Sequence, residues 1–280
     1  MSETAAIAKF ACPACGGNLD VRYDYEQIGA CFSKAALAAD RNFTMWRYRP
    51  LLPMEDAARV PPLTVGWTPL YDAPQLAAEF GVRQVLVKDD GRNPTASFKD
   101  RPSALAVVKA QEVGAAVATT ASSGNAGAAL AGMCASVGMK SVIFVPATTP
   151  AAKVAQLQIY GATVVLVEGS YEQACELCLA ASQRFGWYQR TTGYNPFTAE
   201  GKKTAAFEVF HRTAHVLFRE HAGGIARTPA QDRPFHRFLR IRPIHARERH
   251  RIAGQPRAHF ERREMSRDHN HATTSRARRV

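Results

Sequence analysis

Several residue types are missing from long stretches of this 280-residue chain. Histidine does not occur before residue 211, and lysine does not occur after residue 210. Residues 211–280 also lack Trp, Tyr and Cys, and they contain 17 Arg but only eight Val, Leu or Ile. So little apolar content does not support a packed core. We therefore expect a globular part that ends near residue 210 and a basic, disordered tail over residues 211–280.

No apolar run reaches the roughly 20 residues that a membrane-spanning helix needs, which argues against a membrane protein. Residues 1–10 contain no apolar run of signal-peptide length, so we expect a cytoplasmic protein. Six cysteines in a chain of this length do not indicate a disulfide scaffold. The hydrophobic content of 46% and the charged content of 21% are typical of globular proteins.

The formal net charge of +12 comes almost entirely from the tail. Seventeen arginines could bind a phosphate backbone, so a non-catalytic nucleic-acid-binding protein is the alternative from a different functional class. Apart from four Phe, however, the tail lacks the aromatic residues that base stacking uses. An excess of Arg, His, Pro and Ala is typical of a GC-rich gene read out of frame. We therefore expect a frameshift near codon 210, no specific nucleic acid as partner, and only non-specific polyanion binding.

From residue 83 onward, short β-rich segments alternate with helical ones. The pattern predicts strands over residues 83–88, 115–121, 141–146, 163–167 and 187–191, and helices over residues 99–113, 125–137, 151–160 and 171–185. This alternation is typical of an α/β fold with parallel βαβ units and helices on both faces. Such sheets bind ligands in the loops that follow the carboxyl ends of their strands.

Two of these loops have unusual chemistry. In the loop over residues 93–101, Lys99 stands in the first turn of a predicted helix. The helix dipole disfavours a cation at this position. It therefore favours the neutral amine, which is the nucleophilic form of the side chain. Asp100 and Arg101 are expected to pair with each other. In the loop over residues 119–127, serine hydroxyls and backbone N–H groups at a helix start could bind a carboxylate or a phosphate. An ordinary surface lysine and an ordinary capped loop are the alternatives.

Four stretches then form a specific set by their order, spacing and position after predicted strands. They are residues 66–70, 88–101, 122–127, and 193–197 followed by 200–204. Through them, about half of the chain resembles threonine synthase, a pyridoxal-phosphate enzyme of the tryptophan-synthase-β-like fold. The resemblance divides the chain into an N-terminal region (1–63), an incomplete enzyme domain (64–210) and the tail. It also implies conversion of O-phospho-L-homoserine and water to L-threonine and phosphate.

The resemblance implies a role for each matching residue. Lys99 would hold pyridoxal 5'-phosphate covalently and take the α-proton of the substrate, and Asn125 would hydrogen-bond the ring oxygen of the cofactor. On the substrate side, Ser122, Ser123 and Gly124 would hold the carboxylate. Asn195 would also lie on this side, and Lys202 or Lys203 could bind the phosphate. The chain departs from the family at Ala96, where glycine is frequent. A related lyase, threonine or serine dehydratase, is the alternative within the enzymes, since it shares Lys99 and the serine loop.

The N-terminal region contains a Cys-x-x-Cys knuckle at Cys12 and Cys15, which is similar to the zinc-ribbon-like leader of some threonine synthases. A structural zinc site needs four ligands. Cys31 could be a third ligand, but the sequence shows no clean fourth. The pattern therefore favours a knuckle without metal. A second pair, Cys175 and Cys178, is expected to belong to the core.

The resemblance ends near residue 210, whereas the family continues. The unmatched part would carry the glycine-rich loop for the cofactor phosphate and the hydroxyl partner of the pyridine nitrogen. We therefore expect a truncated and inactive enzyme, and the sequence leaves its oligomeric state open.

Overall fold

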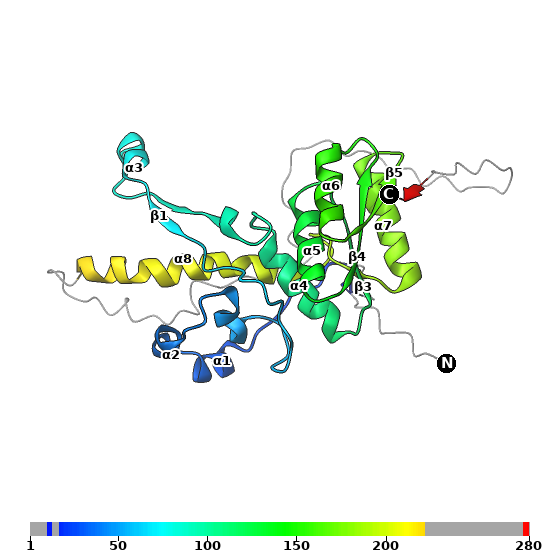
Figure 1. The fold of residues 1–280 in the computed structure, drawn as a ribbon. Helices are drawn as coiled ribbons and strands as arrows, with labels where there is room; N and C mark the ends of the chain where they lie inside the picture. The colour runs from blue at the N-terminus through cyan, green and yellow to red at the C-terminus, as the bar shows by residue number, and fades with distance from the viewer. Residues whose placement is uncertain (1–9, 13–16, 222–276, 280) are drawn as a thin grey trace, which may run out of the picture. The chain divides into compact units, whose positions relative to one another are not determined.

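The computed structural model describes residues 10–12, 17–221 and 277–279. A five-stranded sheet with the strand order β6-β3-β4-β5-β7 organises the enzyme region (Figure 1). Its strands are β3 (Val117–Ala121), β4 (Lys140–Pro146), β5 (Thr163–Val167), β6 (Tyr188–Gln189) and β7 (Ala277–Arg279). Strands β6, β3, β4 and β5 pair in parallel, and β7 pairs antiparallel with β5. The predicted parallel α/β sheet is confirmed.

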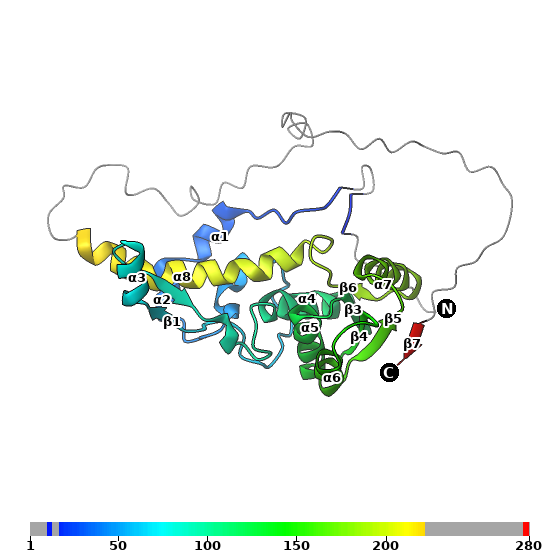
Figure 2. The ribbon, with the colours of Figure 1, turned by 90° about the horizontal axis from the view of Figure 1, so that it is seen from above.

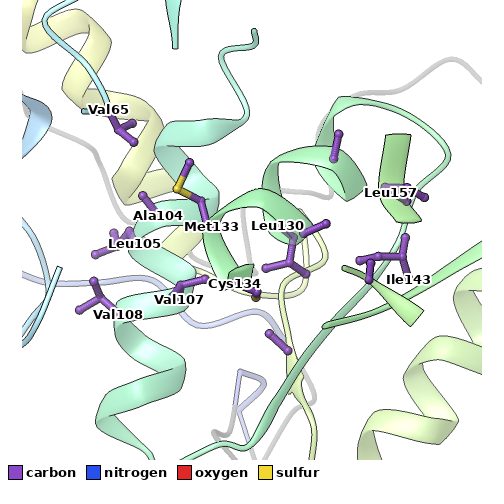
Figure 3. Packing of buried hydrophobic residues seen from close by; sticks show 14 of the residues in the cluster. Val65, Ala104, Leu105, Val107, Val108, Leu130, Met133, Cys134, Ile143 and Leu157 are labelled. Atoms are coloured by element: carbon purple, nitrogen blue, oxygen red, sulfur yellow. The ribbon is translucent and has the colours of Figure 1, made fainter. Parts of the chain in front are cut away.

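Helices cover both faces of this sheet (Figures 1 and 2). Helices α5 (Asn125–Ser136) and α6 (Ala151–Ile159) lie on one face, and α7 (Tyr171–Phe185) lies on the other, while α4 (Asp100–Glu112) packs against α5. Side chains of β4 alternate between the two faces, as a strand requires. Ile143 packs with Leu130 and Leu157 on one face (Figure 3), whereas Phe144 packs with the buried Cys178 of α7 on the other.

The helices begin and end close to where the sequence predicts them. Helix α7 covers the predicted range because Ser170 and Gln173 form a reciprocal capping box at its start. It ends at Gly186, whose φ of 67° lies in the left-handed region that glycine adopts without strain. Cys178 is fully buried, which confirms its predicted place in the core.

One predicted strand belongs elsewhere. Strand β2 (Leu86–Lys88) pairs antiparallel with β1 (Leu70–Asp72) in a separate two-stranded ribbon, with α3 (Pro74–Phe80) between them. The expectation that residues 83–88 join the parallel sheet was wrong. The ribbon leaves Tyr71 and Val87 about half exposed, so it lacks the two covered faces that a central parallel strand needs.

The N-terminal region packs on the enzyme region. It contains α1 (Tyr25–Cys31), α2 (Lys34–Ala39) and the 3-10 helix η1 (Met45–Leu51). Met45 and Trp46 are buried in the same cluster as Leu130. Phe10 makes edge-to-face contacts with three aromatic rings, those of Tyr188, Tyr194 and Phe197.

Helix α8 (Phe197–His221) continues through residue 210, where the resemblance ends. Two parts of the tail are described: residues 211–221, which continue α8, and β7, an edge strand that pairs with β5. Residues 222–276, which make up most of the predicted disordered tail, lie outside the described residues. Within the described part of the chain, no helix is both long and apolar enough to cross a membrane.

Candidate functional site

Lys99 stands at the start of α4, as the sequence predicts, and a compact loop holds it there. The backbone N–H of Thr95 donates a hydrogen bond of 2.7 Å to the carboxylate of Asp100, and the Thr95 hydroxyl donates a second one. Burial raises the pKa of Asp100. The lysine amine itself lies 5.3 Å from the centre of the Phe98 ring and is half-buried.

Ala96 lies within this loop with a φ of 57°, in the left-handed region that side chains with a Cβ rarely adopt. This conformation explains in physical terms why glycine would suit the position. The alanine is accommodated, but at a cost in backbone strain.

Arg101 does not pair with Asp100, so that sequence expectation was wrong. Its guanidinium instead donates to Asp90 at 2.8 Å and to Glu208 at 2.6 Å, because Asp100 is already occupied by Thr95. Glu208 of α8 also accepts from the ammonium of Lys88 of β2 at 2.6 Å. Burial acts to raise the pKa of Glu208, but the hydrogen bonds and charges of Arg101 and Lys88 outweigh it and lower that pKa.

The buried network of Lys88, Asp90, Arg101 and Glu208, together with Thr68, joins three segments that are distant in the sequence. It fixes the first turn of α4, and with it Lys99, against the ribbon and α8. Gly201 of α8 allows the close approach, since a Cβ at that position would lie 2.6 Å from the carbonyl oxygen of Arg101.

The serine loop connects β3 to α5. The N–H of Gly124 donates to the hydroxyl of Ser122 at 3.2 Å, and α5 begins without a side-chain cap. Gly127 keeps the loop tight, because a Cβ there would lie 2.5 Å from the carbonyl oxygen of Ser122. Ser123 is half-buried and Asn125 is exposed. A helix start of this kind can bind an anion, which suits the predicted carboxylate contact.

Sequence reasoning missed Arg190, which follows β6. Its side chain is 1% exposed and donates to the hydroxyls of Ser103 at 3.2 Å and Thr192 at 3.3 Å. Its Nη2 has no hydrogen-bond partner, and no ion pair joins this arginine to a carboxylate among the described residues. Burial lowers the pKa of Arg190 to about 10. The available signal was a cation directly after a strand of the parallel sheet, followed by the two hydroxyl residues Thr191 and Thr192.

The structure separates the two lysines of α8 that the sequence could not distinguish. Lys203 pairs with Glu200 at 2.5 Å, and its ammonium lies 3.9 Å from the ring centre of Tyr23. Lys202 makes no ion pair within the described part of the chain. Burial lowers the pKa of Lys202, and the positive charges of Arg190 and Lys99 lower it further.

Asn195 is buried, and its amide is engaged inside the fold. It donates to the hydroxyl of Tyr188 at 3.0 Å and to the carbonyl oxygen of Gln189 at 2.9 Å. Its oxygen accepts from the N–H of Phe197 at 2.9 Å, at the start of α8. These bonds tie α8 to β6, and a contact of Asn195 with the substrate stays a prediction.

The cysteine knuckle is only partly described. The N–H of Cys12 donates to the carbonyl oxygen of Gly17 at 2.8 Å, and Ala11 bridges Asn18, so the chain reverses direction there. Cys15 lies outside the described residues, so the structure does not place the two cysteines of the predicted pair relative to each other. No group of three or more His, Cys, Asp or Glu within residues 10–12, 17–221 and 277–279 could hold a metal ion.

Comparison with known proteins places this site in a family. Residues 62–224 match the family model for pyridoxal-phosphate dependent enzymes, which is more than half of the chain. The threonine synthase of Methanocaldococcus jannaschii is 39% identical over 196 residues, which cover 70% of this chain and 48% of that protein. The threonine synthase of Methanosarcina acetivorans is 37% identical over 203 residues, with 71% and 48% covered.

Among solved structures, the processed form of threonine deaminase isoform 2 from Solanum lycopersicum is 20% identical with a TM-score of 0.51. That match covers 76% of this chain and 55% of the deaminase, and it indicates a shared fold. The chain spans about half the length of the curated relatives that it matches. The match over residues 62–224, together with the parallel α/β sheet, leads to one conclusion: the chain belongs to the pyridoxal-phosphate dependent enzyme family.

Proposed function

We propose that the described residues form the lysine side of a threonine synthase active site, in a cytoplasmic protein. The reaction would convert O-phospho-L-homoserine and water to L-threonine and phosphate. The observation that carries this proposal is that the start of α4, which holds Lys99, packs against α8 at Gly201, beside Lys202, although the two segments are far apart in the sequence. Curated relatives at 39% and 37% identity that carry the name threonine synthase support the synthase over a dehydratase.

The residues at this edge fit pyridoxal phosphate. The amine of Lys99 has no carboxylate partner among the described residues, so it is available for covalent attachment of the cofactor aldehyde. Asn125 is exposed at the start of α5, where its amide could reach the ring oxygen. When bound, the cofactor supplies an electron sink for the carbanion formed at the α-carbon of the substrate.

The protein itself would orient the substrate and move its protons. Ser122, Ser123 and Gly124 would hold the α-carboxylate at the uncapped start of α5, where backbone N–H groups attract an anion. The Lys99 amine would take the α-proton, since a half-buried amine without a counter-ion can act as a base. Lys202 would then face the phosphate that leaves from the γ-carbon, while Lys203 stays paired with Glu200.

Absorbance of the purified chain with pyridoxal phosphate tests this proposal. We expect a band near roughly 410–430 nm, which marks a cofactor joined to a lysine amine, in the wild type and in a Lys153→Ala control. Lys153 is exposed on α6 and makes a matched surface control. The band should disappear in Lys99→Ala. A band of equal strength in Lys99→Ala would overturn the assignment of the lysine.

Two activity assays distinguish the synthase from the alternative lyase. Phosphate release from O-phospho-L-homoserine reports the synthase reaction, and ammonia release from L-threonine reports the dehydratase reaction. Phosphate release that requires Lys99 would contradict the sequence-based expectation that this chain is inactive by itself. Ammonia release without phosphate release would replace the synthase with the dehydratase.

A further inference from the structure

The described N-terminal residues between 10 and 23 contact the segment from β6 to the start of α8 at three points. At the first point, Phe10 is 3% exposed and packs edge-to-face against three aromatic rings of that segment. At the second point, the side-chain amide of Asn18 donates to the carbonyl oxygen of Gly193 at 2.7 Å. Figure 2 shows this N-terminal part of the chain beside the start of α8. Two segments that are distant in the sequence therefore lie side by side.

The third point is a polar contact on α8 itself. The hydroxyl of Tyr23 donates to Oε2 of Glu200 at 2.5 Å, and the ammonium of Lys203 lies 3.9 Å from the centre of the Tyr23 ring. Glu200 and Lys203 also pair with each other at 2.5 Å, so one tyrosine contacts both members of an ion pair. Burial and the adjacent carboxylate raise the pKa of Tyr23, so its hydroxyl keeps the proton that it donates.

The first turns of α8 are thus held on two faces. The ion pair contacts Tyr23 on one face. On another face, Gly201 approaches the backbone of Arg101 closely, and Glu208 accepts from the Arg101 guanidinium. Helix positions three or four apart share a face, so these two sets of contacts are separate. Lys202 lies between them in the sequence, and its orientation depends on both.

The two faces differ in burial. Arg101 and Glu208 are fully buried, whereas Tyr23 is only half-buried and residues 17–20 are exposed. Elements that are held by a few partly exposed contacts open locally at a lower cost than core elements do. The N-terminal contact with α8 is therefore the one that can open while the core stays folded.

We propose that Tyr23 is a positioning residue, which holds the start of α8 through Glu200 and thereby sets the affinity of the substrate-side segment, from Asn195 to Lys202, for its ligand. Tyr23 would act without touching the ligand. Attachment of the cofactor to Lys99 would not depend on it. The identity of the ligand rests on the proposed function, whereas the coupling between Tyr23 and α8 does not.

Hydrogen–deuterium exchange of the full chain tests the coupling without any ligand. We expect Tyr23→Phe to raise the exchange rates of residues 201–206 by roughly 10-fold, because it removes a hydrogen bond to a charged group. Phenylalanine keeps an aromatic ring at the position. Tyr71→Phe, at a half-exposed tyrosine of β1, is the matched control and should leave these rates unchanged. Unchanged rates in Tyr23→Phe would overturn the proposal.

Ligand affinity tests the consequence for the site. In a Lys99→Ala background, which prevents turnover, Tyr23→Phe should weaken binding of O-phospho-L-homoserine by roughly 10-fold in the presence of pyridoxal phosphate. Asn18→Ala, at an exposed position, should weaken it in the same direction. With Lys99 in place, the absorbance band and the melting temperature should stay close to wild type in Tyr23→Phe. A tyrosine that only stabilises the fold would lower the affinity, the band and the melting temperature together, and that result would contradict a positioning role.

A double-mutant cycle assigns the effect to Glu200. In a Glu200→Ala background, Tyr23→Phe should change the exchange rates no further, and an equal effect in both backgrounds would exclude this route. The same data separate the proposal from the proposed function. If the wild type binds no O-phospho-L-homoserine, the proposed function fails. Faster exchange in Tyr23→Phe would then still support the coupling, and unchanged exchange would overturn it.

Discussion

The five-stranded sheet and the β1–β2 ribbon contain similar strand-forming segments, yet they bury them to very different degrees. In β4, Ile143 and Val145 are fully buried under α5 and α6, and Phe144 is buried under α7. In the ribbon, Val87 and Tyr71 remain 42% and 48% exposed. A strand of apolar residues therefore does not define a core by itself. Helices must cover both of its faces.

The largest effect is expected where the two regions are joined. Glu208→Ala removes the carboxylate that contacts both Arg101 of α4 and Lys88 of β2, and it leaves buried cations without that partner. We expect the free energy of unfolding to fall by about 3–5 kcal/mol in urea denaturation at pH 7. Glu176→Ala, an exposed position on α7, is the control and should change it by less than about 0.5 kcal/mol. A small effect at Glu208 would show that the ribbon and the sheet region are not coupled through this network.

The same carboxylate should make stability depend on pH. The pKa of Glu208 is lowered in the folded protein, because hydrogen bonds and charges from Arg101 and Lys88 outweigh the effect of burial. Its contribution is therefore present above the ordinary glutamate pKa and is lost as the pH falls through the lower, folded value. Between pH 7 and pH 3, the wild type should lose more stability than Glu208→Gln. Equal losses would contradict this assignment.

Truncation of core side chains should distinguish the two regions directly. Leu130→Ala in α5 creates a cavity in the packed cluster of Figure 3 and should cost about 2–5 kcal/mol. Val87→Ala in β2 removes a side chain that is 42% exposed and should cost less than about 1 kcal/mol. Chemical denaturation measures both variants. Similar costs would mean that the ribbon is covered in solution by something that this structure does not contain.

The smallest effect is expected in the lysine loop, between the two regions. Ala96→Gly should raise the free energy of unfolding by about 1 kcal/mol, because glycine adopts a φ of 57° without steric cost. Ala155→Gly, at an exposed position inside α6, is the matched control and should lower it by about 1 kcal/mol. Opposite signs for the same substitution would confirm that strain in the loop is the cause.

The sequence predicted the helices and the parallel strands well because their signals are local. Residues 163–167 and 171–185 were predicted from the alternation of β-rich and helical segments, and β5 and α7 have those bounds. It failed for residues 83–88, because a three-residue strand carries no information about its partner. The antiparallel pairing of β2 with β1 depends on contacts that only the folded chain makes.

The candidate site likewise has one part that sequence motifs predict and another part that depends on contacts of the folded chain. The position of Lys99 before a helix and the serine loop after a strand follow from sequence motifs. The environment of Arg190 could not be predicted, because it depends on which groups distant segments bring to the side chain, such as the hydroxyl of Ser103. Lys202 and Lys203 are adjacent in the sequence. The structure distinguishes them because Lys203 contacts Glu200 and Tyr23.

By itself, the sequence determined the α/β class, the order of the elements from residue 99 to residue 191, and the loops that carry the chemistry. The tertiary structure decided that Arg101 pairs with Glu208 rather than Asp100, and that Arg190 is buried with no ion pair among the described residues. The reason is physical. Periodicity and capping act over a few neighbouring residues, whereas the free energy of a buried charge depends on groups that distant segments bring within a few ångströms.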